Sequence, residues 1–279
     1  MNIKDRIILK KRDDVQISLV RDFGGNKFIE KMKPHYPFGN TFHGCDFCEL
    51  EKIESIIKPL GIPHPRIIES SKDDKNTTFI MEFIDGINCE DEPKAVHLYI
   101  AAEKLGEIYK KSIKYMNRLD KAIVEKYSIT RKVILGYIKV IRQHYDLPPT
   151  DAIIDYIFNK YQNRAPFVNH GDMQFKNFIC NDDLRLIDWD DSSISPFNRD
   201  LCTLMWQANE IGADINEIKN RYYESAKIND IAEEEFHIAG VIEEIIMLHI
   251  IITINESDEW AEDTYNNLQG LLKDFSYHK

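Results

Sequence analysis

The sequence has no long uninterrupted apolar run, no basic segment, no internal repeat and no low-complexity linker. A membrane-spanning helix needs about 20 mainly apolar residues, so we expect no membrane span. The first residues, 1–6, also lack the apolar stretch of a signal peptide. At 279 residues, the chain is long enough for one large domain or two lobes with a substantial core. These features agree with a soluble globular protein.

Cysteine is also scarce. The five cysteines are odd in number and mostly scattered, as is typical of a reduced cytoplasmic protein: Cys45, Cys48, Cys89, Cys180 and Cys202. Cys45-x-x-Cys48 has the spacing of a metal or redox motif. Without a second pair or a nearby histidine at ligand spacing, we do not assign that role to it. We therefore expect a cytoplasmic location.

Positive charge is missing mainly from the last quarter of the chain. Residues 1–204 contain 31 acidic and 31 basic residues, whereas residues 205–279 contain 16 acidic and 5 basic residues. The whole net charge of −11 therefore lies in the last quarter. Because proteins that bind nucleic acid usually carry a basic patch, we expect no nucleic-acid partner.

Most of the candidate functional residues lie in one stretch, residues 168–201. It contains His170-Gly171-Asp172, then Asn177, and then Asp188 within Ile-Asp-Trp-Asp. Two short apolar runs within residues 178–187 flank Asn-Asp-Asp, which predicts a hairpin with Asn177 at one end and Asp188 at the other. Asp172 lies in the preceding loop. Three converging oxygen-bearing side chains suit a Mg²⁺-bound triphosphate and a hydroxyl that must lose its proton.

The order H-G-D-x-x-x-x-N followed by I-D-W resembles the aminoglycoside phosphotransferase and choline kinase family. A lone His-Gly-Asp would be typical of a simple turn, but the joint pattern is more specific. The resemblance implies an α+β, protein-kinase-like fold of two lobes: a small antiparallel-sheet N-lobe over residues 1–85 and a larger, mainly helical C-lobe over 86–279. It also implies γ-phosphate transfer from ATP (or GTP), with Mg²⁺, to a hydroxyl of a small molecule. Asp172 would be the catalytic base, and Asn177 and Asp188 the Mg²⁺ ligands.

The N-terminal part should form the nucleotide-binding sheet, with strands over 6–10, 15–22 and 27–33. The loop from Lys11 to Asp14 would cover the phosphates, but it lacks G-x-G-x-x-G and carries two aspartates, so we assign no phosphate contacts to it. By the resemblance, Lys31 fits the lysine that positions the phosphates. The alternative is that Lys31 and Lys33 are both solvated.

A helix over residues 46–60 should supply the glutamate that pairs with this lysine. Glu49, Glu51 and Glu54 compete for the role. Glu49 borders the apolar face that contains Ile53 and Ile56. We therefore favour Glu49, with Glu51 in reserve.

The segment Phe-Ile-Met-Glu-Phe-Ile-Asp-Gly at 79–86 resembles the hinge that reads adenine in this family. Strands are expected beside it at 66–69 and 77–83. Met81 would close the back of the pocket, the Glu82 carbonyl would accept from adenine, and the Ile84 amide would donate to it. An ordinary buried strand leading into a turn is compatible with the same residues.

The remainder is predicted to be helical over 96–116, 129–145, 151–161, 201–211, 214–227, 231–254 and 257–275. The resemblance places the acceptor between the catalytic loop and the C-terminal helices. Acidic residues there, at 233–235 and 243–244, favour a cationic acceptor such as an aminoglycoside or amino-alcohol; solvent-facing helix residues are the alternative. By the same resemblance, Asp200 would brace the loop, and His170 would orient it.

Two other functions remain open. A non-catalytic nucleotide-binding or scaffold protein could keep the same fold. A Ser/Thr protein kinase is disfavoured because Asp188 and Asp200 are only twelve positions apart, with no D-F-G and A-P-E around an activation loop. Antibiotic resistance, nutrient salvage and lipid-precursor synthesis all use this scaffold, and fold analogy does not choose among them.

Overall fold

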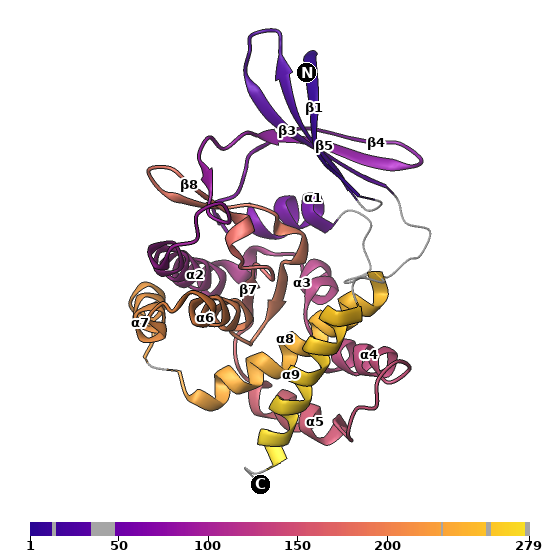
Figure 1. Cartoon of the computed structure of the whole chain (residues 1–279), viewed down its shortest axis with the longest axis vertical. Coiled ribbons are helices and arrows are strands. Elements are labelled where there is room, and N and C mark those ends of the chain that lie inside the picture. Colours follow the sequence, from indigo (N-terminus) through magenta and orange to yellow (C-terminus); the bar gives the residue numbers. More distant parts are fainter. Residues whose placement is uncertain (13–14, 35–47, 230, 255–257, 277–279) are drawn as a thin grey trace.

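The computed structural model describes residues 1–279 except 13–14, 35–47, 230, 255–257 and 277–279. A five-stranded antiparallel sheet forms one end of the molecule, and helices form the other (Figure 1). This confirms the expected fold class, with a sheet in the N-terminal part and a mainly helical remainder. The strand order is β1-β2-β3-β5-β4. The strands are β1 (Ile3–Lys11), β2 (Gln16–Asp22), β3 (Lys27–Pro34), β4 (Ile67–Lys72) and β5 (Asn76–Glu82).

A broken helix lies under this sheet (Figure 1). It starts as α1 (Cys48–Lys52) and continues as the π-helix η2 (Ile53–Ile57). We predicted one regular helix over 46–60, and the structure differs in its second half, where the backbone widens. The buried isoleucines of η2 anchor the segment in the core.

Short strands and turns connect the sheet to the helices. They are β6 (Ile87–Asn88), β7 (Phe167–Asn169), η4 (Phe175–Asn177), β8 (Phe178–Cys180), β9 (Leu184–Leu186), η5 (Trp189–Asp191) and β10 (Ser193–Ser195). β8 and β9 form the predicted hairpin, with Phe178 opposite Leu186. β6 pairs with β8, and β7 pairs with β10. β6, β7 and β10 were not predicted, because runs of two or three residues give no recognisable periodicity.

The helices are α2 (Ala95–Tyr115), η3 (Met116–Arg118), α3 (Lys121–Tyr127), α4 (Arg131–Ile141), α5 (Asp151–Tyr161), α6 (Arg199–Ile211), α7 (Ile215–Ala226), α8 (Glu233–Ile254) and α9 (Asp258–Ser276). Only α3 was missed. It begins at an N-cap, Asp120, whose carboxylate accepts a hydrogen bond from the Ala122 amide at 2.7 Å. This aspartate was the available sequence signal.

α8 packs against α4, α6 and α9. Residues 233–253 are long and apolar enough to cross a membrane by composition, but 72% of that window is buried inside the protein. A mostly buried helix of this kind is typical of a protein core. Its apolar character was underestimated from the sequence because Glu243 and Glu244 interrupt it.

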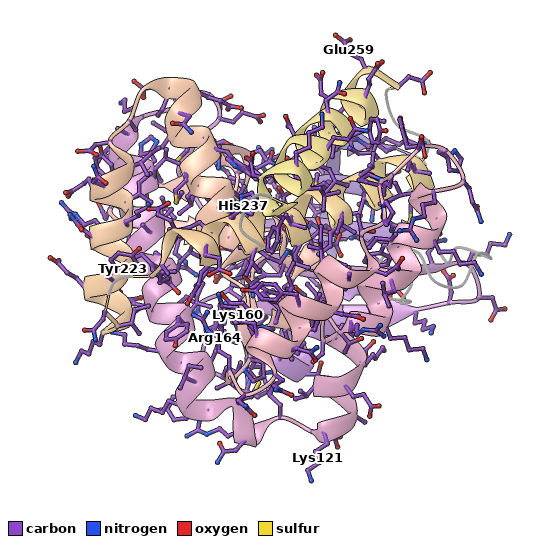
Figure 2. The ribbon with its side chains drawn as sticks, turned by 90° about the horizontal axis from the view of Figure 1, so that it is seen from below. Lys121, Lys160, Arg164, Tyr223, His237 and Glu259 are labelled. Carbon is purple, nitrogen blue, oxygen red and sulfur yellow. The ribbon has the colours of Figure 1, made fainter. Side chains whose placement is uncertain are left out.

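The first turn of α8 is held by ion pairs. Figure 2 shows Lys160 and Arg164, at and after the end of α5, on the underside of the molecule. They pair with Glu234 and Glu235, respectively. Glu233 pairs with Lys219 on α7 at 2.7 Å. Glu233 and Glu234 are exposed, so the acidic run 233–235 fits the alternative of solvent-facing helix residues, here paired with basic neighbours.

A buried ion pair joins α8 to α6. The Arg199 side chain donates to the Glu243 carboxylate at 2.5 Å and to the Ser193 hydroxyl at 2.8 Å. Arg199 and Glu243 are only 1% and 3% exposed. A buried charge that loses its partner is strongly destabilising, so this pair fixes how the two helices meet.

Replacing Glu243 with Gln should lower the free energy of unfolding by about 3–5 kcal/mol, because the Arg199 guanidinium stays buried without a counter-charge. The matched control is Glu54→Gln, which removes a solvent-exposed pair with Lys58 and should change stability by less than about 0.5 kcal/mol. Urea unfolding measures both. Equal losses in the two variants would contradict this account of the pair.

Candidate active site

Lys31 on β3 is the centre of the candidate site. Its ammonium donates to Glu49 Oε2 at 2.6 Å and to Asp188 Oδ1 at 2.8 Å. Lys31 is only 6% exposed. Burial lowers the pKa of Lys31, but Asp188 and Glu49 outweigh it and hold the pKa above its ordinary value. A charged ammonium thus links the sheet, α1 and the segment after β9.

Among the three competing glutamates, Glu49 is the one that pairs with Lys31. Its other oxygen, Oε1, accepts from the Trp189 amide at 3.3 Å. Glu51 instead pairs with Lys126 on α3 at 2.6 Å, and Glu54 pairs with Lys58.

Two further lysines surround the turn after Asp188. Lys33 forms an ion pair with Asp190, so the solvated alternative does not describe it. Lys52 is fully buried and donates to the Asp190 carbonyl. Burial raises the pKa of the half-buried Asp191 to about 6. Sequence reasoning missed Lys52, although it lies one turn after Glu49 on the same helix.

Asp188 has a left-handed backbone, with φ of 63°. Aspartate tolerates this conformation better than most residues. The preceding Ile187 amide donates to the Asn177 carbonyl at 3.0 Å, which ties the turn to the other end of the hairpin. Burial raises the pKa of the Asp188 carboxyl, but Lys31 and Lys33 outweigh burial and hold it well below its usual range. Asp188 is therefore an anion at neutral pH.

The His170-Gly171-Asp172 loop is fixed by its backbone. The His170 and Gly171 amides donate to the Asp200 carboxylate at 2.6 and 2.8 Å, the bracing contact expected for Asp200. His170 Nδ1 accepts from the Asp172 amide at 3.4 Å, so its Nε2 carries the proton and donates to the Ile187 carbonyl at 3.0 Å. The His170 side chain thus links the loop to the end of the hairpin.

Gly171 is required at its position. Its φ is +89°, and a Cβ built there would lie 2.0 Å from the Asp191 carbonyl oxygen. The loop and the η5 turn therefore pass closer together than a larger residue allows.

Asp172 and Asn177 are in direct contact. The Asn177 amide nitrogen donates to the Asp172 carbonyl at 2.8 Å and to Asp172 Oδ2 at 2.9 Å. Lys176 also contacts Asp172 Oδ2, at 2.9 Å. Because its nitrogen is used in this way, the Asn177 oxygen is the atom that remains for a cation.

The donors near Asp188 fit a hard cation. Carboxylate oxygens of Glu49, Asp188 and Asp190 lie within 4.8 Å of one another. The backbone bond from the Ile187 amide to the Asn177 carbonyl brings Asn177 next to the same turn. Magnesium takes oxygen ligands and keeps several waters, so one or two carboxylates are enough. The residues present therefore fit the expected Mg²⁺.

The predicted hinge residues lie at the end of β5. Met81 is buried, and Glu82 is half-buried and pairs with Arg185 at 3.2 Å. The half-buried Ile84 lies two residues beyond the end of the strand. The Asn181 side chain donates to the Asp85 carbonyl at 2.9 Å, so the hairpin tip contacts this segment. The expected phosphate loop falls partly outside the described residues, as do Cys45 and the side chain of Cys48.

A pocket of about 900 Å³ opens between the loop after Asp172 and helices α6, α8 and α9. Lys176, which contacts Asp172, is part of its wall, so the pocket adjoins the candidate base. Its lining includes five carboxylates and two tryptophans: Glu90, Glu210, Glu243, Glu244, Asp274, Trp206 and Trp260. Sequence reasoning did not identify the tryptophans, because helix periodicity does not show which faces of α6 and α9 meet.

Alanine should have opposite effects at two glycines. Gly171→Ala should lower the free energy of unfolding by at least about 2 kcal/mol, because it adds backbone strain and a clash with Asp191. Gly136→Ala, in α4 with open space around the site, should raise it by about 0.5–1 kcal/mol. Thermal or urea unfolding measures both. A neutral Gly171→Ala would show that the close approach does not constrain the loop.

The chain resembles known proteins both in sequence and in fold. Residues 52–237, more than half of the chain, match the model of the phosphotransferase enzyme family. None of the curated proteins matches the sequence. Solved structures do match in fold.

Three of these structures illustrate the likeness. The choline kinase LicA from Streptococcus pneumoniae has a TM-score of 0.64 and 15% identity, over 98% of this chain and 95% of its own. A choline/ethanolamine kinase family protein from Mesorhizobium loti has a TM-score of 0.63 and 13% identity, over 98% and 90%. A spectinomycin phosphotransferase, solved with ADP and spectinomycin, has a TM-score of 0.54 and 13% identity, over 95% and 88%. The chain therefore belongs to the phosphotransferase enzyme family and has the protein-kinase-like fold of these neighbours.

Proposed function

We propose that this phosphotransferase is a small-molecule kinase that transfers the γ-phosphate of ATP (or GTP) to a hydroxyl of a cationic acceptor. The observation that carries the proposal is the connected set around Lys31. This lysine contacts Glu49 and Asp188, while Asp172 and Asn177 contact each other beside a large pocket. Phosphoryl transfer needs such a set, because its catalysis is mostly positioning and charge neutralisation.

The nucleotide would bind between the sheet and the hairpin. We place the boundary of the lobes after Asp85, with an N-lobe over 1–85 and a C-lobe over 86–279. Met81 would then back the adenine site, and the Glu82 carbonyl and Ile84 amide would pair with the base. Lys31, held by Glu49, would position the phosphates. Support comes from the ADP in the spectinomycin phosphotransferase structure.

Asn177 and Asp188 would hold Mg²⁺. When bound, the ion would neutralise charge on the phosphate oxygens. Asp188 is fixed for this by the hydrogen bond from Ile187 to Asn177 and by Lys31. Asn177 is fixed by its amide contacts to Asp172.

Asp172 would accept the proton of the acceptor hydroxyl. Its contacts to Asn177 and Lys176 both involve Oδ2, so we assign Oδ1 as the proton acceptor. The bracing of the loop by Asp200 and His170 holds this carboxylate in place. A base fixed in this way is effective because proton transfer depends first on geometry.

The acceptor would bind in the pocket beside Lys176. The carboxylates of Glu90, Glu210 and Asp274 on its wall attract a cation. The faces of Trp206 and Trp260 can contribute cation–π attraction. The names of the structural neighbours, which include choline and ethanolamine kinases, are consistent with an amine-bearing alcohol.

Asp172→Asn tests the assigned base. The new amide still offers an oxygen for the Asn177 contact, but it cannot accept the proton of the acceptor hydroxyl. We therefore expect kcat to fall by about 10²–10⁴-fold, while the affinity for MgATP is retained. The activity is first found by screening amino-sugars, amino-alcohols and neutral sugars for acceptor-dependent ADP release. Asp182→Asn, at the exposed hairpin tip, is the control. Full turnover by Asp172→Asn would remove Asp172 from this role. Preference for a neutral acceptor would contradict the assignment of a cationic acceptor to the acidic pocket.

Asp188→Asn tests the metal assignment separately. Loss of the carboxylate should weaken MgATP binding, since Asp188 is the anionic ligand in the proposed pair. Calorimetry with and without Mg²⁺ measures the effect. If Asp188→Asn binds MgATP as tightly as the wild type does, Asp188 is not a ligand. If the wild type binds MgATP but transfers no phosphate to any acceptor tested, the non-catalytic alternative is favoured.

Acceptor binding should depend on pH through Glu244. Burial, with the neighbouring Glu243, raises the pKa of Glu244 to about 8, against a hydrogen bond from Asn267. Glu244 is therefore neutral at pH 7 and becomes an anion above pH 8. For a quaternary-ammonium alcohol, whose charge does not change with pH, KM should fall by roughly 10-fold between pH 7 and 9, the effect of one added charge within about 10 Å.

The controls isolate Glu244 from other titrations. Glu244→Gln should abolish this change in KM, whereas Glu224→Gln, on an exposed position of α7, should leave it intact. A KM that does not change with pH in the wild type would show that Glu244 does not face the acceptor.

A further inference from the structure

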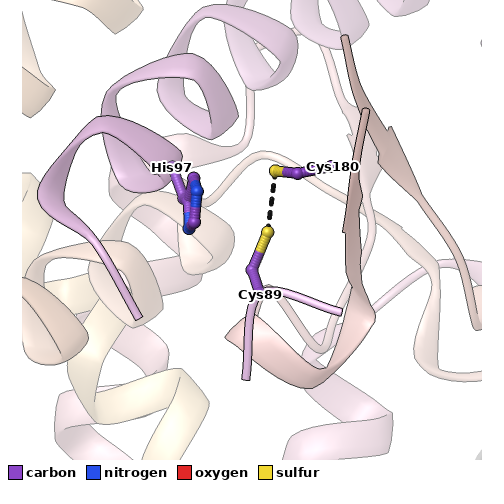
Figure 3. A group of neighbouring side chains, drawn as sticks. All are labelled: Cys89, His97 and Cys180. Atoms are coloured by element: carbon purple, nitrogen blue, oxygen red, sulfur yellow. Dashed lines mark hydrogen bonds between the residues drawn. The ribbon is translucent and has the colours of Figure 1, made fainter. Parts of the chain in front are cut away.

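A second cluster of potential ligands lies apart from the candidate active site. It consists of Cys89 after β6, Cys180 at the end of β8 and His97 in the first turn of α2 (Figure 3). The two sulfurs are 2.8 Å apart, and both cysteines are free thiols. A ring nitrogen of His97 lies within 4.8 Å of both sulfurs. Three separate segments thus bring two sulfurs and a nitrogen to one point.

Strand pairing brings the two cysteines together. Ile87 is opposite Cys180 in the β6–β8 pair, and the Cys89 amide donates to the Phe178 carbonyl at 2.9 Å. Because alternate residues of a strand share a face, Cys89 and Cys180 are diagonal neighbours on one face of this small sheet. Their proximity therefore follows from the backbone register.

The histidine is incompletely satisfied. His97 Nδ1 is buried and has no hydrogen-bond partner among the residues that the structure describes. The ring also makes an edge-to-face contact with Phe175, at 6.5 Å between centroids. A buried polar atom without a partner is unfavourable, and a ligand that engages the imidazole would relieve this cost.

We propose that Cys89, His97 and Cys180 form a Zn²⁺ site. Two sulfurs and an imidazole nitrogen are the donors that zinc prefers, and a water can complete the tetrahedron. The oxygen-only cluster of Glu49, Asp188 and Asp190 differs in kind and suits a hard cation. On binding, each cysteine forms a sulfur–zinc bond and releases its thiol proton to solvent.

The site needs only a small adjustment. Zinc–sulfur bonds of about 2.3 Å place two tetrahedral ligands about 3.7 Å apart, so the sulfurs must separate by roughly 1 Å. Cys180 and His97 are half-buried and can move toward solvent. The zinc would tie the segment after the hinge to α2 and to the hairpin that begins next to Asn177, which would stabilise the folded chain by mass action.

Metal titration of the reduced full-length chain, freed of metal by a chelator, tests the site. Cys45→Ser, Cys48→Ser and Cys202→Ser are combined as a background that leaves Cys89 and Cys180 as the remaining thiols. In this background, Co²⁺ should bind at one ion per chain with thiolate-to-cobalt charge-transfer absorption. Zn²⁺ should displace it and raise the Tm. Absence of Co²⁺ absorption would overturn the proposal.

Single substitutions in this background identify the ligands. Cys180→Ser and His97→Gln should each weaken Zn²⁺ binding by at least about 10-fold, and Cys180→Ser should remove most of the charge-transfer absorption. His144→Gln, at an exposed histidine, should change neither quantity. Unchanged affinity in Cys180→Ser would exclude the cluster, as would a Cys89–Cys180 disulfide in protein prepared without reductant. If Cys180→Ser does not fold, the Zn²⁺-dependent Tm of the background and of His97→Gln decides the question.

Discussion

The buried ammonium of Lys31 is the constraint on which the rest of the site depends. A charge removed from water is tolerated only when it is matched by opposite charges with good geometry. Glu49 and Asp188 provide this match from α1 and from the turn after β9. The sheet, the helix beneath it and the β8–β9 hairpin must therefore come together in one arrangement. The same arrangement sets the ionisation of Asp188.

The first turn of α6 connects the His170–Asp172 loop to the wall of the large pocket. Arg199 extends to Glu243 on α8, while the adjacent Asp200 accepts from the His170 and Gly171 amides. Glu243 also lines the large pocket. Two consecutive residues thus link the pocket wall to the segment that holds Asp172, so disturbing either contact is expected to affect both.

The sequence was informative where the signal is local. The hairpin, most helices and the H-G-D-x-x-x-x-N spacing could be read from short patterns. The apolar neighbours of Glu49 also favoured it correctly over Glu51 as the partner of Lys31. Signals were lost where contacts join distant segments. Lys52 bonding to Asp190, the pairing of residues 233–235 with α5 and α7, and the tryptophans of the pocket all depend on packing that periodicity does not reveal. From the sequence alone, residues 233–235 were expected to attract a cationic acceptor, because their basic partners lie far away in the sequence.

The contact from the Asn181 side chain to the Asp85 carbonyl has a mechanical consequence. A second side-chain amide, that of Asn88, donates to the Lys176 carbonyl at 3.0 Å. Residues 85–88, which connect the sheet to the helices, are thus hydrogen-bonded at one end to the β8–β9 hairpin and at the other end to the segment before it. A rotation of the sheet about residues 85–88 must either break these bonds or move the hairpin with it, so such a rotation would also displace Asn177 at the start of the hairpin.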